Sequence, residues 1–189
     1  MNKKIDVPVK MDIADKELLA RMVKPHHLIS RSVQAQYDTE DIDRVIKESV
    51  VLYKLCFQPI GLYGSAFAMA HPQIDDQDPL RMFVTAEKQI ILNPRIIKHS
   101  GYTVDSKEGC MTLPELPTIN VPRWHKCEVE YKTVMIDPED PNKFVLSGYQ
   151  EDSLSGQKAY IWQHEIDHLN GRYIYDDLLE KLNNEKQNV

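Results

Sequence analysis

The chain has 189 residues, 42% of them hydrophobic, with a formal net charge of −6 and a pI near 5.6. This acidic balance lacks the basic footprint of a nucleic-acid-binding protein, which argues against a large DNA or RNA interface. A chain of this length fits one domain with its own core, so we expect a single domain over 1–189, with an N-terminal extension over 1–23 and a flexible tail over 183–189.

The N-terminal segment carries lysines but no apolar run that would serve as a signal peptide, and no stretch is long and apolar enough to cross a membrane. We therefore expect a soluble, cytoplasmic protein. Three cysteines cannot all pair with one another, and in a reducing compartment their thiols are expected to be free or bound to a metal. They are Cys56, Cys110 and Cys127.

The first predicted element is an amphipathic helix over 39–56. Thr39 is a capping candidate, acidic residues follow it, and apolar residues then recur at helical spacing. These apolar positions are Ile42, Ile46, Val50 and Tyr53. Residues 58–65 contain a proline and two glycines, which break regular structure, so this segment is predicted to be a loop.

The middle of the chain is predicted to form strands. Short apolar runs indicate three of them, the third closed by the turn signal Asn93-Pro94, and a cleanly alternating run and a further short run indicate two more. The predicted strands are 67–70, 82–85, 89–92, 127–134 and 143–146.

A second helix is predicted over 158–169, ended by Asn170-Gly171. A short strand over 173–175 and a surface helix over 176–184 follow. Strands with one early and one late helix favour the α+β class over alternating α/β.

The strongest chemical signal is the run His164-Glu165-Ile166-Asp167-His168 within the second helix. Positions i and i+4 lie on one helix face, so the two imidazoles are placed to bind one metal ion. The glutamate between them is then placed to act on a metal-bound water. A chance occurrence is the alternative, but the apolar residues around the motif indicate a buried helix, where such polar groups need partners.

A hydrolytic metal site needs a third protein ligand, and Cys110 in the run Glu108–Glu115 (EGCMTLPE) is the candidate. A thiolate is a strong soft ligand, and Gly109 lets the backbone approach closely. From the residues alone, an ordinary small buried residue is the favoured interpretation of Cys110, as it is of Cys56 and Cys127, because most free cysteines are of that kind.

Two motifs carry a family resemblance. EGCMTLPE at 108–115 and QHEIDHLNG at 163–171 are similar to signature motifs of the peptide deformylases, and the resemblance covers roughly 24–182. The family's glycine-rich first motif is altered here to AFAMAHPQ at 66–73. Asn93-Pro94 and Val121-Pro122-Arg123 also match the family.

The resemblance implies that Cys110, His164 and His168 bind the metal and that Glu165 is the catalytic acid and base. It implies an oxyanion hole made by the Gln73 side chain and the Met111 backbone N–H. Residues expected to contact the substrate are Phe67, Ala68, Gly109, Tyr160 and Ile161. Residues expected to orient the ligands are Glu108, Arg123 and Asp167, although a surface ion pair of little value is the alternative for Arg123.

The family's activity, as the resemblance implies it, is hydrolysis of the formyl group from the N-terminal methionine of newly made polypeptides. The implied metal is one Fe(II) per chain, with Zn, Ni or Co able to substitute. The implied fold is a catalytic domain with antiparallel strands around a central metal-binding helix, an N-terminal helix and a C-terminal helix. The implied partners are N-formylmethionyl nascent chains and a weak contact with the ribosome, without DNA or membrane.

Three positions depart from the family pattern. Ala68 stands where glycine is usual, on the edge that receives substrate as an added strand. His71 replaces an alanine, and we favour an ordinary solvated or core histidine over a fourth ligand. Gln157 stands in the methionine-side pocket where an apolar residue is usual.

These departures leave two alternatives open beside a deformylase. One is a divergent hydrolase that acts on another N-acyl peptide. The other is a non-catalytic metal-containing protein that binds formyl peptides without cleaving them, against which Glu165 argues because a purely structural metal site needs no base.

Overall fold

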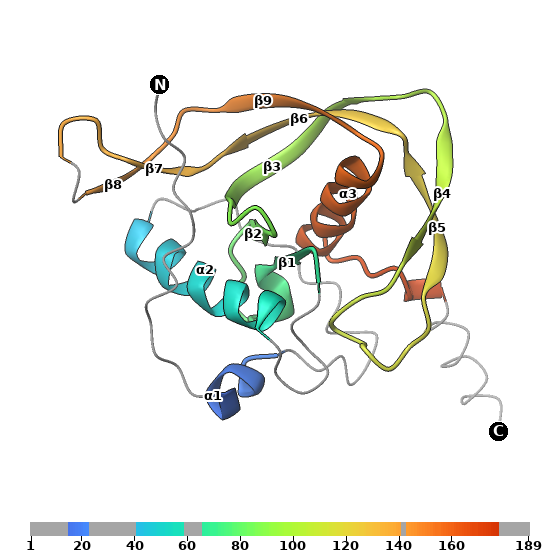
Figure 1. The fold of residues 1–189 in the computed structure, drawn as a ribbon, viewed down its shortest axis with the longest axis horizontal. Helices are drawn as coiled ribbons and strands as arrows, with labels where there is room; N and C mark the ends of the chain where they lie inside the picture. The colour runs from blue at the N-terminus through green and yellow to red at the C-terminus, as the bar shows by residue number, and fades with distance from the viewer. Residues whose placement is uncertain (1–14, 23–40, 59–65, 141–142, 178–189) are drawn as a thin grey trace.

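A computed structural model of the chain describes residues 15–22, 41–58, 66–140 and 143–177 (Figure 1). The elements in chain order are α1 (Asp15–Ala20), α2 (Ile42–Phe57), β1 (Ala68–Ala70), the 3-10 turn η2 (His71–Gln73), β2 (Met82–Thr85), β3 (Ile90–His99), β4 (Thr103–Glu108), β5 (Ile119–Trp124), β6 (Lys126–Lys132), β7 (Val134–Ile136), β8 (Phe144–Leu146), β9 (Gln150–Ser155) and α3 (Gln157–Leu169).

The strands form one five-stranded sheet in the order β1-β2-β3-β6-β9 and two hairpins, β4-β5 and β7-β8. Every pairing is antiparallel. The long strands β3, β6 and β9 arch over α3, and the β4-β5 hairpin descends beside it (Figure 1). The expected α+β class, with antiparallel strands around a central helix, is confirmed.

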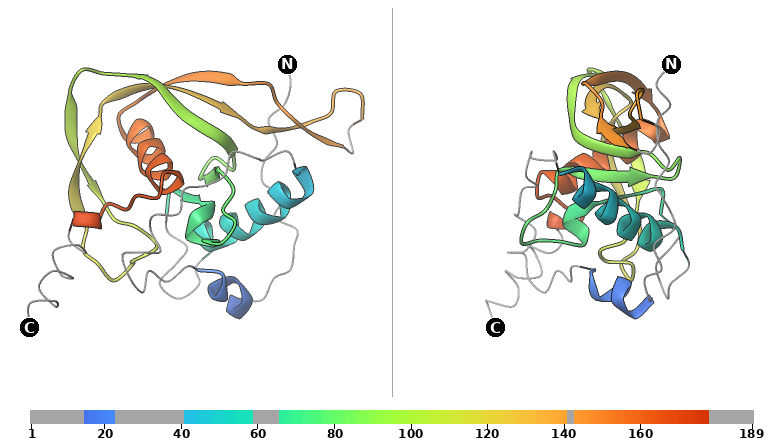
Figure 2. Two further views of the ribbon diagram at one scale, coloured as in Figure 1. Left: turned by 180° about the vertical axis from the view of Figure 1, so that it is seen from behind. Right: turned by 90° about the vertical axis from the view of Figure 1, so that its left-hand side faces the viewer.

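The first three strands divide the interior into two cores. Successive side chains of a strand point to opposite faces, so Met69 of β1 faces the core that α2 covers, while Ala68 and Ala70 face the core beneath α3. The same alternation continues in β2 and β3. The front view (Figure 1) and the view from behind (Figure 2, left) show β1 and β2 between α2 and α3. Strand β1 therefore holds its residues directly against α3, the helix that carries the histidines.

The predicted first helix is present as α2. Its N-cap is Asp41, whose Oδ1 accepts a hydrogen bond from the Arg44 backbone N–H at 3.1 Å. Thr39, the predicted cap, and 59–65, the body of the predicted loop, lie outside the described residues.

The prediction that Asn93-Pro94 ends a strand is wrong, because β3 continues through it to His99. Asn93 adopts a positive φ of 48°, and the pairing of β3 with β6 shifts register between Leu92 and Arg95. This irregularity accommodates the proline, which has no N–H to give to the ladder.

Other boundaries also differ from the predictions. The strand predicted over 127–134 is divided into β6 and β7, and the strand predicted over 173–175 is a loop. Strands β4, β5 and β9 were not predicted. The chain turns helical at Asp176 and Asp177, and the remainder of the predicted surface helix lies outside the described residues.

Helix α3 is fixed at both ends and along its buried face. Gly156 before it and Gly171 after it have positive φ values of 58° and 74°, which suit glycine. The guanidinium of Arg81 donates to the carbonyl oxygens of Leu169, at the end of α3, and Pro94. Trp162 packs edge-on against aromatic rings of the sheet, so the helix has little freedom to rotate.

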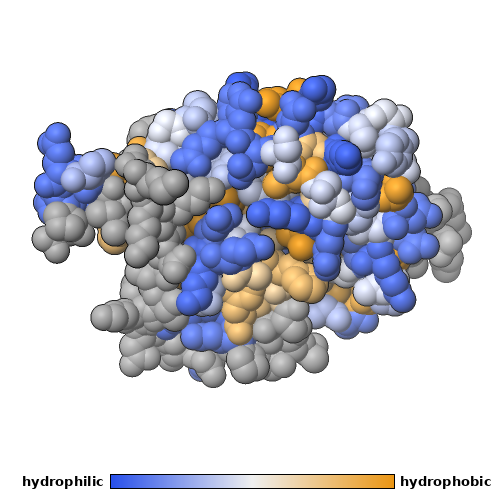
Figure 3. All heavy atoms as spheres, turned by 45° about the horizontal axis from the view of Figure 1, so that its top comes forward, coloured by the Kyte–Doolittle hydropathy of each residue, from blue (hydrophilic) through white to orange (hydrophobic). Residues whose placement is uncertain are grey.

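The face shown in Figure 3 is mainly hydrophilic, with small groups of hydrophobic side chains between the polar ones. Large exposed hydrophobic side chains in the described part of the chain are Phe67, Ile97, Tyr102 and Tyr149. None of the helices in the described ranges combines the length and apolarity needed to span a lipid bilayer.

Candidate metal centre and active site

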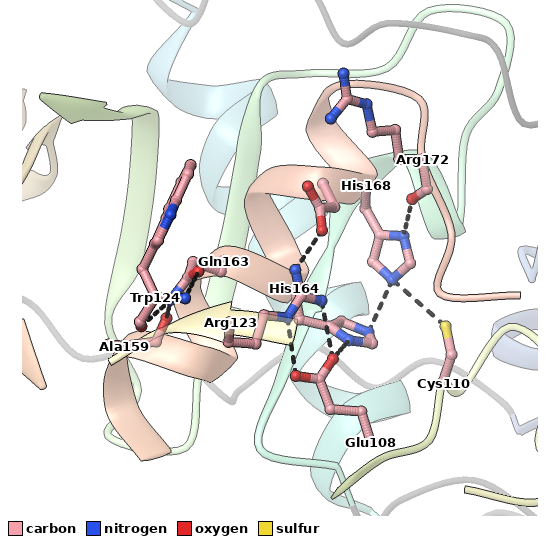
Figure 4. Close-up of polar contacts among 10 residues, drawn as sticks. Glu108, Cys110, Arg123, Trp124, Ala159, Gln163, His164, His168 and Arg172 are labelled. Atoms are coloured by element: carbon pink, nitrogen blue, oxygen red, sulfur yellow. Dashed lines mark hydrogen bonds and ion pairs between the residues drawn. The ribbon is translucent and has the colours of Figure 1, made fainter. Parts of the chain in front are cut away.

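Three side chains from two segments lie together in one cluster (Figure 4). His164 and His168 project from consecutive turns of α3, and Cys110 approaches from the loop after β4. Their ligand atoms all lie within 4.8 Å of one another. His168 Nε2 is 3.1 Å from His164 Nε2 and 3.4 Å from Cys110 Sγ, so one ion can contact all three.

Both imidazoles are held through their outer ring nitrogens. His164 Nδ1–H donates to Glu108 Oε2 at 2.9 Å, and His168 Nδ1–H donates to the Arg172 carbonyl oxygen at 3.0 Å (Figure 4). These bonds assign the proton to Nδ1 in each ring, which leaves both Nε2 lone pairs directed at the cluster.

Arg123 links two carboxylates behind the histidines. Its guanidinium bonds both oxygens of Glu108, at 2.9 and 2.8 Å, and its Nη1 also bonds Asp167. The Arg123 side chain is only 6% exposed, so the alternative of a surface ion pair is excluded. Burial alone would raise the pKa of Glu108, but hydrogen bonds from Arg123 and His164 lower it to about 2.

The donor set and one unpartnered atom both fit a catalytic metal. Burial raises the pKa of the Cys110 thiol, but the neighbouring His168 and His164 lower it by more, to well below its ordinary value, which favours the thiolate that a metal binds. Glu165 is 4% exposed, and its Oε2 has no hydrogen-bond partner among the described residues. Burial raises the pKa of this carboxyl. A buried carboxyl oxygen without a described partner, beside these three side chains, fits a site that would be completed when a metal and its solvent are bound.

Gln73 lies close to Cys110, at the end of η2. Its Oε1 accepts from the Ala70 N–H at 2.8 Å, and its Nε2 donates to Thr112 Oγ1 at 3.0 Å and lies 3.9 Å from Cys110 Sγ. An amide nitrogen carries two hydrogens, and one bond to Thr112 leaves the other directed toward the cluster.

A cavity of about 430 Å³ opens over the cluster. The residues expected to contact substrate all line it: Phe67, Ala68, Gly109, Tyr160 and Ile161. Met111, Gln73, Gln157 and Glu165 line it as well. Gly109 does not have a left-handed backbone, and a Cβ there would stand 3.4 Å from Thr118 Cγ2. The backbone at this position therefore does not require glycine, and an added Cβ would make an ordinary van der Waals contact with Thr118.

Several contacts at the site were not predicted. Tyr160 Oη lies 2.7 Å from His125 Nδ1, so one wall of the cavity has a polar hydroxyl held in place. The Tyr173 ring packs against His168, with the ring centroids 4.8 Å apart. Thr112 bonds Gln73. Thr112 had a sequence signal, its place within the cysteine motif. His125 meets Tyr160 across 35 positions of the chain, and Tyr173 meets His168 through the course of the loop after α3.

His71, Cys56 and Cys127, which the sequence analysis also considered, lie outside the cluster of Cys110, His164 and His168. His71 is fully buried and bonds Glu48 and a backbone amide, as expected for a core histidine and not for a fourth ligand. Cys56 and Cys127 are buried free thiols whose pKa is raised by burial, to about 11 for Cys127.

Comparison with known proteins agrees with this geometry. The family model described as polypeptide deformylase matches residues 15–185. The chain belongs to this family. The match includes the cysteine loop, the histidine helix and the altered first motif, so the resemblance carried by the two motifs extends over all the described residues.

Peptide deformylases from other organisms are moderately similar in sequence to this chain. The one from Thermus thermophilus is 34% identical over 107 residues, which cover 57% of this chain and 49% of the relative. The one from Thermotoga neapolitana is 35% identical over 86 residues, or 46% and 45% of the two chains. The chain thus spans about half the length of the curated relatives it matches.

Solved deformylase structures share the fold. The class I type b enzyme from Acinetobacter baumannii superposes with a TM-score of 0.64 at 21% identity, covering 82% of this chain and 97% of that one. The Plasmodium falciparum enzyme gives 0.61 at 24% identity, covering 88% and 96%. At this sequence identity the structural similarity shows a shared fold and nothing further.

Proposed function

We propose that this chain is a metal-dependent hydrolase that removes the N-formyl group from the N-terminal methionine of newly made polypeptides. The observation that carries the proposal is the buried Glu165 carboxylate, unpaired at Oε2 among the described residues, beside the Cys110, His164 and His168 cluster at the floor of an open cavity. Family membership supports the choice of a formylated peptide as substrate.

Cys110, His164 and His168 would hold one divalent ion, with Fe(II) proposed as the native metal and Zn, Ni or Co as substitutes. Such an ion, when bound, supplies Lewis acidity for the formyl carbonyl and lowers the pKa of water. The soft thiolate and two imidazoles suit either Fe(II) or Zn.

Glu165 would transfer the protons of the reaction. Its raised pKa suits a group that takes a proton from the attacking water and returns it to the departing amine. Burial keeps bulk water from competing for that carboxylate.

Gln73 and the Met111 N–H would stabilise the charge that develops on the formyl oxygen. The two come from different elements, η2 and the loop after β4, and both line the cavity. Because Oε1 of Gln73 is fixed by the Ala70 N–H, its Nε2 is held before substrate arrives, which is the condition for effective stabilisation of developing charge.

The peptide would add as a strand along β1, an edge strand of the described sheet. Ala68 is in β1 and lines the cavity without breaking the pairing with Thr85, so its methyl group is compatible with the strand itself. Gln157 and the Tyr160 hydroxyl make the cavity wall partly polar. We propose that the enzyme acts as a single cytoplasmic domain on chains leaving the ribosome.

The test is an anaerobic assay of formate release from a formyl-methionyl peptide by Fe(II)-loaded protein. Glu165→Gln at equal iron content is expected to lower kcat by about 10²–10⁴-fold, the usual share of general acid–base catalysis. An N-acetyl-methionyl peptide is the control for substrate class. Iron-loaded wild-type protein that binds formyl peptide without releasing formate would instead be a binder, and hydrolysis of the acetyl peptide alone would identify a different acyl hydrolase.

A further inference from the structure

A second buried polar group lies near the cavity but outside the metal cluster. The His71 ring is fully buried, and its Nε2–H donates to Glu48 Oε2 of α2 at 3.3 Å. Arg21, which follows α1, donates to the same carboxylate oxygen at 2.6 Å. The turn η2 is thereby tied to α2 and, through Glu48, to the end of α1.

The other nitrogen of the His71 ring is also occupied. The backbone N–H of Leu80 donates to His71 Nδ1 at 3.0 Å. Because Nδ1 accepts, the ring proton resides on Nε2, where it bonds Glu48, and both the tautomer and the orientation of the ring are set. His71 therefore links η2 to α2 on one side and to the segment entering β2 on the other.

The turn that His71 anchors is the one that carries Gln73. A 3-10 turn of three residues has weak internal hydrogen bonding and depends on outside contacts to persist. The His71 carbonyl oxygen accepts from the N–H groups of Ile74 and Asp75, at 2.9 and 3.1 Å, which closes the turn around Gln73. A shift of His71 would therefore move the Gln73 backbone and the amide that it aims at the cavity.

We propose that His71 is a positioning residue for Gln73, and that its bonds to Glu48 and to the Leu80 N–H hold the Gln73 amide where the formyl oxygen is stabilised. The inference rests on the proposed function in that Gln73 contacts the substrate. It gives a role to a buried imidazole that lies outside the cluster: its hydrogen bonds hold the turn from two sides.

A double-mutant cycle in kcat tests the proposal with the Fe(II)-loaded enzyme. Gln73→Ala is expected to lower kcat by about 10²-fold, since losing one such donor typically costs 10²–10³. His71→Ala is expected to lower kcat about tenfold with KM within about twofold, because a displaced donor loses part of its effect on the developing charge. In the Gln73→Ala background, His71→Ala should change kcat by less than about twofold, because the side-chain amide that His71 positions is absent.

Equal losses of kcat from His71→Ala in both backgrounds would overturn the proposal. So would an unchanged kcat for His71→Ala alone. If wild-type protein releases no formate, the proposed function fails, and the positioning of Gln73 is then decided by spectroscopy. The Gln73 side-chain amide resonances of Zn(II)-loaded protein, identified by their loss in Gln73→Ala, should shift in His71→Ala and in Glu48→Gln. Resonances at their wild-type positions would overturn the inference without any assay of activity.

Two further variants separate positioning from loss of stability. His71→Gln keeps a donor that reaches toward Glu48 and should recover part of the lost kcat. Val45→Ala removes buried apolar volume from α2 and keeps the Glu48 and His71 side chains, so it should lower the melting temperature while kcat and the Gln73 resonances stay as in wild type. A kcat loss in Val45→Ala matching that of His71→Ala would show that α2 stability, and not the histidine, governs the rate.

Discussion

Two buried groups in this molecule have the same composition, a glutamate bonded by one histidine and one arginine. Glu108 accepts from His164 and Arg123 behind the metal cluster, and Glu48 accepts from His71 and Arg21 beneath η2. Both carboxyls resist protonation: burial would raise the pKa of each, but the hydrogen bonds from the two partners lower it to about 2.

The second nitrogen of each imidazole distinguishes the two groups. In His164 it faces the cluster with a free lone pair, whereas in His71 it accepts the Leu80 N–H. The arginines differ too: Arg123 is 6% exposed and bonds two carboxylates, while Arg21 is 33% exposed and bonds one. The same three residue types thus hold a ring of the candidate metal site in one place and a ring of the turn η2 in the other. What faces the second ring nitrogen, the cluster or the Leu80 N–H, distinguishes the two groups.

The largest difference between the groups should appear when the arginine is removed. Arg123→Met leaves the largely buried Glu108 carboxylate and the partly exposed Asp167 carboxylate without their common partner, and should lower the free energy of unfolding by about 3–5 kcal/mol. Arg21→Met is the matched variant, and since its side chain is a third exposed it should cost about 1 kcal/mol or less. Urea unfolding at saturating Zn measures both. Equal losses would mean that exposure does not distinguish the two groups.

Acid titration should reveal the stabilising contribution of Glu48. Its folded-state pKa, about 2, lies below the ordinary 4.5, so its contribution is complete above pH 4.5 and is lost as the pH falls toward 2. Glu48→Gln should therefore cost about 2–3 kcal/mol at pH 7, with the difference from wild type shrinking between pH 4.5 and pH 2. Urea midpoints across that range provide the measurement, and a difference independent of pH would contradict the assigned interactions.

A smaller and more selective effect is expected on metal binding. Glu108→Gln keeps a partner for His164 Nδ1 but loses the charge that orients the ligand, so Zn affinity should fall about 10–100-fold. Glu48→Gln is the control, because it changes the same residue type away from the cluster, and its Zn affinity should stay within about twofold of wild type. Competition with a chromophoric chelator measures both. A comparable loss in Glu48→Gln would show that overall stability, and not ligand orientation, sets the affinity.

The sequence by itself determined the local features and, through its motifs, the family. The spacing of His164, Glu165 and His168 sets their common helix face, and the predicted helix over 158–169 differs from α3 by one residue. Strand β2 was predicted with its observed bounds, since four consecutive buried residues leave a clear apolar run. Such features depend on neighbours within a few residues, which periodicity and turn residues report directly.

Tertiary structure decided what depends on distant partners. Strands β4 and β9 have few buried residues and acquire their conformation from pairing with β5 and β6. Arg123 meets carboxylates 15 and 44 residues away, and His71 meets one 23 residues away. A charged residue has the same local sequence signature on a solvated surface as in a buried pair, because the difference lies in which segments the fold brings together.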